Sequence, residues 1–323
     1  MSTLYNFYFK KDFLFLNQQA DYFLLDILQD HILALLGLIL ILFNLFFKIT
    51  AAPFHFWAPS VYGKAPRASV TFLAIFLKVV IFFVLFKFLY VLFNNLYVQI
   101  MPILFVSSIF SVCFGIVGAL SEKITKKFFV YSSMGHVGFM LAGLSISTLS
   151  GATATFHYLF VYMLTSFLLW YILFFLGPEK NHLTDLAELK NSNVLLALLF
   201  TLIGFSMSGI PPLAGFFIKF NIFCSLFETS NYYASIFLLG LTLPSFFYYL
   251  RFIKIIWFDG EVVQNQEETL NITFQKTEHF EIDTESETLS YVYAYIAFSI
   301  IFYIFLNKHC LIYILSELLF SLF

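Results

Sequence analysis

The chain has 323 residues, of which 61% are hydrophobic and only 11% are charged, and its formal net charge is −2. Soluble domains carry about 25% charged residues, so this composition excludes an ordinary soluble protein and indicates one embedded in lipid. The near-neutral charge also offers no basic surface of the kind that binds nucleic acid.

The apolar segments exceed 18 residues and lack polar alternation, which predicts an all-α, polytopic membrane helix bundle. We expect about eight transmembrane helices within residues 31–306, two of them broken at the membrane midplane. Residues 1–30 precede them as an N-terminal arm. This arm mixes charged and aromatic residues without a signal-peptide pattern, so we expect it to lie at the membrane interface.

The first helix is expected from His31 to Trp57, with an interruption near Pro53. Proline removes a backbone donor and clashes with the carbonyl four residues earlier, so the helix should open there. Lys48 lies five residues before this proline. The next four helices are expected at residues 68–93, 100–120, 128–149 and 153–176, and the first of these four contains Lys78.

The sixth helix is also predicted to be broken at a proline and to carry a lysine near the break. Its apolar run spans residues 194–208, continues through the sequence GIPP, and resumes over residues 213–227 with Lys219 inside. The seventh helix is expected at 232–258 and the last at 289–306. A polar, acidic loop at 259–288 separates them, and the apolar tail 307–323 is too short to span a membrane alone.

The loops alternate between two kinds along the chain. Those on one side lack Lys and Arg, whereas those on the other carry Lys64, Arg67, Lys123, Lys126, Lys127, Lys180 and Lys190. The positive-inside rule places the lysine-bearing loops in the cytoplasm or the mitochondrial matrix.

Three lysines lie inside apolar segments: Lys48, Lys78 and Lys219. A charge at mid-membrane costs at least about 2.5–3.5 kcal/mol, so such a residue indicates a functional site. Each could instead snorkel to the interface, an interpretation we prefer for Lys64 and Lys87. About ten apolar or small residues flank Lys78 on each side, which makes snorkelling harder there. We therefore interpret the three lysines as a proton or ion path, in which the broken helices free carbonyls that need polar partners.

His136 and His157 lie in predicted helices and could pass a proton between their two ring nitrogens. Both could equally be packed, hydrogen-bonded structural residues. For His31 and His55 the structural interpretation is favoured.

No other catalytic or cofactor-binding chemistry is visible. The chain has no dinucleotide fingerprint, P-loop, CxxC pair or haem motif. The three cysteines lie in separate apolar segments without metal-ligand spacing, so no metal site is expected. We expect this chain to hold no cofactor.

Three motifs occur in a familiar order: KITAAPFHFWAPSVYGKAP from Lys48, VYSSMGHVGF from Val130, and GIPPLAGFFIK from Gly209. Together they resemble the antiporter-like subunits of respiratory complex I, and within them the subunit 2 family of NADH dehydrogenase. The resemblance extends over about residues 31–306. It implies a proton-translocating role in NADH:ubiquinone oxidoreductase, with NADH, FMN, iron–sulfur clusters and ubiquinone bound by other subunits.

The resemblance also implies roles for the lysines. Lys48 matches the lysine of the family's first broken helix, Lys78 that of the following helix, and Lys219 that of the second broken helix. In the family they belong to a hydrated polar axis. The family also carries a glutamate, on an upstream helix, that pairs with the first lysine. This chain resembles the last eight of the family's fourteen helices and shows no such glutamate. We therefore expect a separate chain to supply the missing helices and that carboxylate.

The sequence thus predicts a membrane-arm subunit that relays protons without redox chemistry of its own. It is expected beside other membrane-arm subunits and lipids, in the mitochondrial inner membrane. Phe occurs 47 times, Tyr 19 times and Arg only at Arg67 and Arg251, as an AT-rich organelle genome would favour. Two alternatives remain open: a subunit of a cation/proton antiporter, and a scaffold that does not conduct.

Overall fold

The computed structural model describes residues 33–93, 96–175, 181–211 and 213–258. Throughout these ranges the regular elements are helices, and the β-structure is one isolated bridge between Ile124 and His182. The predicted all-α fold is confirmed. The expected arm, acidic loop, last helix and tail (residues 1–30, 259–288, 289–306 and 307–323) lie outside the described residues.

The chain divides into two compact units, residues 1–45 and 46–323. In the first unit, residues 33–45 are helical and belong to the short apolar helix Leu33–Ile49. Several of its large apolar side chains, such as Leu33, Leu36 and Leu40, are exposed, as expected for a helix that faces lipid or another chain.

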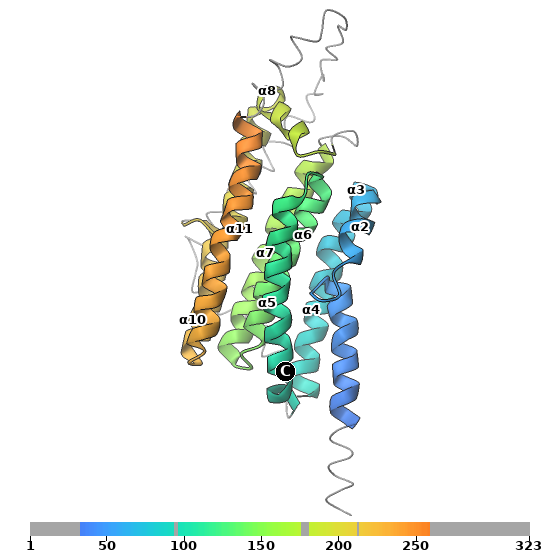
Figure 1. The fold of residues 1–323 in the computed structure, drawn as a ribbon, viewed down its shortest axis with the longest axis vertical. Helices are drawn as coiled ribbons and strands as arrows, with labels where there is room; N and C mark the ends of the chain where they lie inside the picture. Colours follow the sequence, from blue (N-terminus) through green and yellow to red (C-terminus); the bar gives the residue numbers. More distant parts are fainter. Residues whose placement is uncertain (1–32, 94–95, 176–180, 212, 259–323) are drawn as a thin grey trace, which may run out of the picture. The chain divides into compact units, whose positions relative to one another are not determined.

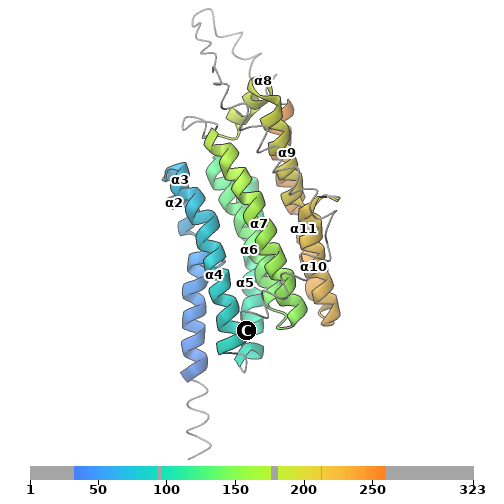
Figure 2. The same ribbon diagram turned by 180° about the vertical axis from the view of Figure 1, so that it is seen from behind.

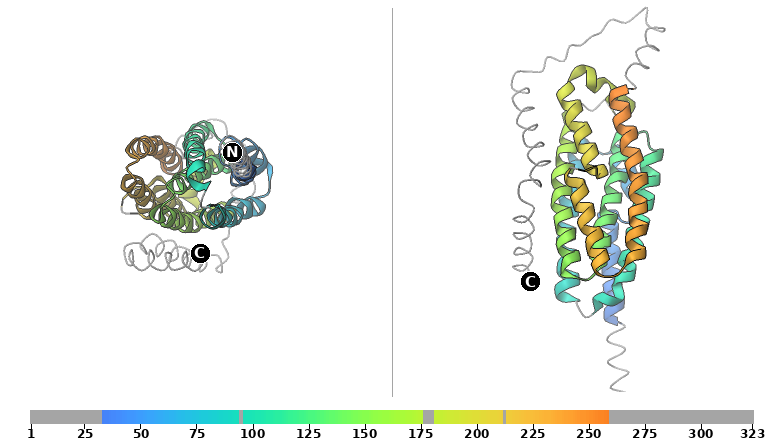
Figure 3. Two further views of the ribbon diagram at one scale, coloured as in Figure 1. Left: turned by 90° about the horizontal axis from the view of Figure 1, so that it is seen from below. Right: turned by 90° about the vertical axis from the view of Figure 1, so that its left-hand side faces the viewer.

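The second unit contains the labelled helices (Figure 1). In chain order these are α2 (Trp57–Lys64), α3 (Arg67–Phe72), η1 (Leu73–Leu77), α4 (Lys78–Phe86), η2 (Lys87–Leu92), α5 (Tyr97–Ser121), α6 (Thr125–Leu144), α7 (Leu149–Phe175), η4 (Thr184–Glu188), α8 (Leu189–Ser192), α9 (Val194–Ser208), α10 (Ala214–Glu228) and α11 (Tyr232–Phe258). The segments α5, α6 and α7 lie between α4 and the pair α10–α11, as the opposite view and the end view also show (Figures 2 and 3).

Four helices of the described chain are long and apolar enough to cross a membrane: Arg67–Tyr90, Tyr97–Ser121, Leu149–Phe174 and Tyr232–Phe258. They correspond to the second, third, fifth and seventh predicted helices. The fourth, α6, is 20 residues long and almost completely buried. Its serines, glycines and histidine lower its hydropathy, which suits a helix surrounded by protein rather than lipid.

Small residues bring α5 and α6 together. A Cβ atom on Gly115 would lie 2.8 Å from the backbone nitrogen of Gly135, and one on Gly138 would lie 2.6 Å from a methyl carbon of Val112. In lipid the hydrophobic effect does not drive helices together, so they associate largely through van der Waals packing. Glycines allow the close approach that this packing needs. The polar residues of α6 are therefore held at the centre of the second unit.

Both predicted helix breaks are present. The first helix ends at Ile49, Thr50 adopts a positive φ of 63°, and α2 begins only at Trp57. The backbone N–H of Ala52, which the break leaves without a helical partner, donates to Ser111 Oγ of α5 at 2.8 Å. The hydrogen bond to Ser111 thus fixes the open segment around Pro53 to α5.

The second break separates α9 from α10. Gly209 caps α9 in the left-handed conformation, with φ 91°, and Asn193 caps its beginning by accepting from the N–H groups of Leu195 and Leu196. Left-handed backbone favours glycine because a Cβ atom would clash with the following carbonyl. The predicted bounds of α9 are confirmed, and α10 follows from Ala214.

Candidate functional site

Lys78 is completely buried among helices. It is the first residue of α4, directly after the π-helical turn η1. Its Nζ donates to Ser133 Oγ of α6 at 2.8 Å and lies 5.9 Å from the ring centroid of Tyr162 on α7. A hydroxyl oxygen and an aromatic face both stabilise an ammonium group, so Lys78 occupies a polar niche inside an apolar bundle.

Lys219 is 5% exposed and occupies the middle of α10. Its Nζ donates at 2.8 Å to the carbonyl of Ser208, the last residue of α9, and lies 5.3 Å from the ring centroid of Phe139. The final carbonyls of a helix have no partner within that helix. Lys219 therefore binds a carbonyl that the helix break leaves without a helical partner.

His136 lies on α6 and is hydrogen-bonded through both ring nitrogens. Nδ1 is 2.7 Å from the hydroxyl of Tyr158 on α7, and Nε2 is 3.0 Å from the hydroxyl of Tyr249 on α11. Tyr249 also bonds to Ser132 Oγ. Both hydrogen bonds of the ring thus go to tyrosines rather than to Lys78 or Lys219.

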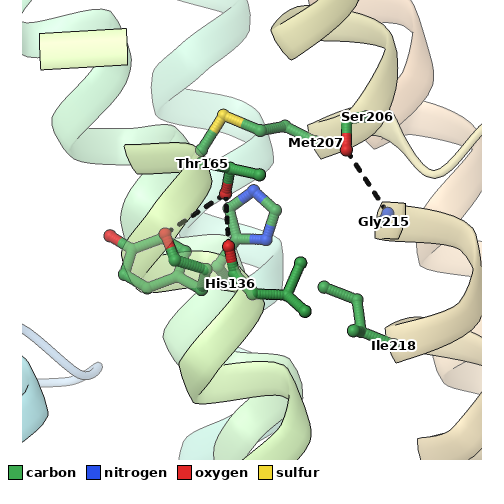
Figure 4. Close-up of a pocket in the computed structure, with 8 residues that line it drawn as sticks. His136, Thr165, Ser206, Met207, Gly215 and Ile218 are labelled. Carbon is green, nitrogen blue, oxygen red and sulfur yellow. Dashed lines mark hydrogen bonds between the residues drawn. The ribbon is translucent and has the colours of Figure 1, made fainter. Parts of the chain in front are cut away.

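A cavity of about 10 Å³ adjoins His136, where α6, α7, α9 and α10 meet (Figure 4). Its lining consists of His136, Val161, Tyr162, Thr165, Ser206, Met207, Gly215 and Ile218. A volume of this size holds about one water molecule when polar partners are present. The imidazole and the hydroxyls of Thr165 and Ser206 are polar groups of the lining, and Gly215 N–H already donates to Ser206 Oγ at 3.4 Å.

His157 is buried on α7, and its Nδ1 lies 3.0 Å from the amide nitrogen of Asn221 on α10. A second, more open cavity of about 160 Å³ adjoins this pair and is also lined by Ser150, Thr153, Ala154, Cys224, Ser225 and Glu228. Asn221 is two residues from Lys219 on α10, so its side chain points to a different face of that helix from the lysine.

Lys48 differs from the other two lysines. Its side chain is exposed, two residues before the positive-φ residue Thr50. Lys78 and Lys219 share one polar interior through α6 and α7, whereas Lys48 lies outside it. His55, in the first break, is buried and stacks on Phe114 at 5.0 Å between ring centroids, and its Nδ1 has no hydrogen-bond partner among the described residues. His31 lies outside the described residues.

Three polar neighbours of these residues were not predicted from the sequence: Tyr158, Asn221 and Tyr249. Each lies on a different helix from the histidine that it contacts. A tyrosine inside a membrane helix is a weak signal in a chain with 19 of them. Buried tyrosine hydroxyls usually have partners, but the sequence does not say which.

Comparison with known proteins gives a consistent result. Residues 1–244 match the family described as NADH:quinone oxidoreductase/Mrp antiporter, TM. The chain is 41% identical over 228 residues to NADH-quinone oxidoreductase subunit N of Pelagibacter ubique, a match that covers 70% of this chain and 48% of that protein. It is 34% identical over 226 residues to NADH-ubiquinone oxidoreductase chain 2 of Marchantia polymorpha, covering 69% and 46%.

Solved structures agree on the fold. A chain of respiratory complex I from Thermus thermophilus with bound aureothin superposes with a TM-score of 0.64 at 25% identity, covering 83% of this chain and 57% of that one. The Mrp complex from Dietzia sp. gives 0.69 at 16% identity, covering 88% and 58%, which shows the fold alone. The chain spans about half the length of the curated relatives it matches. It is a multi-pass membrane protein that belongs to the NADH:quinone oxidoreductase/Mrp antiporter family of transmembrane proteins.

Proposed function

We propose that this chain is a proton-translocating membrane-arm subunit of NADH:ubiquinone oxidoreductase. The observation that carries the proposal is the pair of buried lysines, Lys78 and Lys219, each held by a neutral oxygen inside an apolar bundle. Burial disfavours the charged form of a lysine, so such a group can release and regain a proton within an accessible range. Relatives named as subunits of this oxidoreductase, at 34–41% identity, favour it over other members of the family.

Lys78 and Lys219 act as internal proton carriers in this proposal. Ser133 and the Ser208 carbonyl accept hydrogen bonds from the ammonium groups and stabilise the protonated states. His136 lies on α6 between Ser133 and Phe139, which contact Lys78 and Lys219, and it adjoins the water-sized cavity, so it is suited to serve between the two lysines. His157, which contacts Asn221 of α10, is a second candidate.

Lys48 acts as a switch whose carboxylate partner comes from a separate chain. Its exposed side chain supports this part of the proposal. An ammonium group at mid-membrane is costly when it faces hydrocarbon, and pairing with a carboxylate of a neighbouring chain removes much of that cost. The neighbours proposed here are other membrane-arm subunits, one of which supplies this group.

The chain performs no redox chemistry in this proposal and binds no cofactor. NADH, FMN, iron–sulfur clusters and ubiquinone belong to other subunits, and the complex resides in the mitochondrial inner membrane. The family description also names the Mrp antiporter, which keeps a cation/proton antiporter as a second candidate, because the same lysine layout would serve it. Co-purification with quinone-reducing subunits separates the two.

Replacement of the buried lysines tests the proposal. In the assembled complex, reconstituted in liposomes, Lys78→Met and Lys219→Met should each lower the rate of NADH-driven proton translocation at least about tenfold, because methionine keeps the apolar volume but carries no proton. Lys87→Met is the matched control: Lys87 lies nine residues after Lys78 on the same membrane span, but its side chain is exposed. Undiminished pumping in both buried-lysine variants would contradict the proposal and favour the alternative in which this chain is a scaffold that does not conduct protons.

A further inference from the structure

The histidine at the centre of α6 is enclosed by two tyrosines from other helices. Tyr158 of α7 lies at Nδ1 and Tyr249 of α11 at Nε2, at 2.7 and 3.0 Å. Both tyrosines are almost inaccessible to solvent, with 0% and 1% of their surface exposed. Beyond Tyr249 the chain of contacts continues to Ser132 Oγ. Four side chains from three helices thus form one unbroken series of hydrogen bonds.

The chemistry of this series allows it to conduct a proton. A neutral imidazole donates from one nitrogen and accepts at the other, and a hydroxyl does both. If Tyr158 donates to Nδ1, then Nε2–H donates to Tyr249, and Tyr249 donates to Ser132. The reverse polarity uses the same contacts. The series therefore has two proton arrangements within one fixed framework of heavy atoms.

Each end of the series is one residue removed from a contact of a buried lysine. Ser132 precedes Ser133 on α6, and Ser133 accepts the hydrogen bond of Lys78. At the other end, the ring of Tyr158 stacks on Phe139, with centroids 6.4 Å apart and planes inclined by 15°. Phe139 is also the ring over which Lys219 Nζ lies. The series consequently runs from the surroundings of one lysine to those of the other.

We propose that Tyr158 and Tyr249 are proton-transferring residues that act on either side of His136, an inference that rests on the proposed function. A proton arriving at the Tyr158 oxygen displaces the hydroxyl proton onto Nδ1. The Nε2 proton moves to the Tyr249 oxygen, whose own proton moves to Ser132 Oγ, and the serine releases its proton to a water molecule. One proton enters, one leaves, and nothing is oxidised or reduced. Water also serves the step between Lys219 and Tyr158.

The alternative reading is that the tyrosines only pack α6 against α7 and α11. Tyr249→Phe and Tyr158→Phe separate the two, with Tyr97→Phe as the control. Tyr97 is also a buried tyrosine, and its hydroxyl donates to the carbonyl of Leu144, away from any histidine. All three substitutions remove the same oxygen and one or two hydrogen bonds, but only the first two interrupt the series.

The measurements are proton translocation by the assembled complex in liposomes, in H₂O and in D₂O. Tyr158→Phe and Tyr249→Phe should slow translocation about tenfold, whereas Tyr97→Phe should retain it. The slowed variants should also show a larger solvent isotope effect than the control, because proton transfer then limits the rate. Loss of packing alone does not raise an isotope effect.

Equal translocation and isotope effects in all three variants overturn this proposal. If the buried-lysine variants slow translocation while the tyrosine variants do not, the proposed function stands and the tyrosine relay fails. If Tyr249→Phe does not assemble, Ser132→Ala interrupts the same series without altering an aromatic ring. It should show the same isotope signature, and its absence would count against the relay.

Discussion

The position of single residues around the breaks decides how the lysines are held. Lys78 follows a π-turn, which accommodates an extra residue and rotates the following side chains by about 100° relative to a continuous α-helix. This rotation is part of why Lys78 reaches Ser133. Gly209 leaves room for the Lys219 side chain. A Cβ atom at position 209 would lie 3.1 Å from Lys219 Cδ and 3.4 Å from Lys219 Nζ.

Gly209→Ala should therefore destabilise the protein by about 1–2 kcal/mol, since alanine is strained at φ 91°. It should also slow proton translocation, because the methyl group displaces the lysine side chain. Thermal unfolding and proton translocation of the assembled complex measure the two effects. Gly240→Ala is the control, because this helical glycine has open space around its Cβ position. If the two alanine variants behave alike, the conformation of Gly209 is unimportant.

At the scale of helices, each interrupted helix needs hydrogen-bond partners from neighbouring segments for the backbone groups at its break. The first break depends on Ser111 of α5, which accepts the Ala52 N–H, and on Trp57 Nε1, which donates to the carbonyl of Phe47 at 3.0 Å. The second depends on Lys219 and on the Ser206 hydroxyl. Backbone groups cannot remain unpaired in lipid, so an open segment persists only where another helix supplies partners.

Ser111→Ala should loosen the first break, because it leaves the buried Ala52 N–H without an acceptor, at a cost of about 1–3 kcal/mol. Hydrogen exchange measures this directly: the amides of residues 50–56 should exchange faster, while those of α6 do not change. Ser107→Ala provides the comparison, since Ser107 is a buried serine one turn earlier whose hydroxyl donates only to Leu104 within α5. Equal exchange in both variants would show that Ser111 does not hold the break.

At the scale of the whole molecule, two of the three relay lysines are buried inside the chain and the third is exposed. Lys78 and Lys219 are enclosed by helices α4, α6, α7, α9 and α10 of one compact unit. Lys48 belongs to the same unit but is exposed. A relay of three lysines within the proposed complex therefore needs a neighbouring chain to cover the third.

A structure of the native complex should show a carboxylate of another chain within about 4 Å of Lys48 Nζ, the distance at which ion pairs form. The reason is the cost of leaving the ammonium group against hydrocarbon. Water and groups of this chain alone around Lys48 would contradict the expectation of a separate partner. Lys87, another exposed lysine, serves as the internal comparison, because snorkelling should leave it without such a carboxylate.

Within the described residues, the sequence by itself determined the helical fold, the positions of the apolar helices and the two breaks. It could do so because lipid forces each apolar run to satisfy its own backbone, and proline and glycine interrupt that pattern locally. The lysines were visible for the same reason, since a charge inside an apolar run needs no structural knowledge to be noticed.

Only the tertiary structure decided which groups these residues meet. Lys78 and Ser133 are 55 positions apart, and His136 and Tyr249 are 113 apart. Such pairs depend on how helices are rotated and packed, which the π-turn at η1 and the glycines of α5 and α6 control. The same packing left Lys48 exposed and surrounded His136 with tyrosines, because side-chain partners follow from helix rotation and not from the order of residues along the chain.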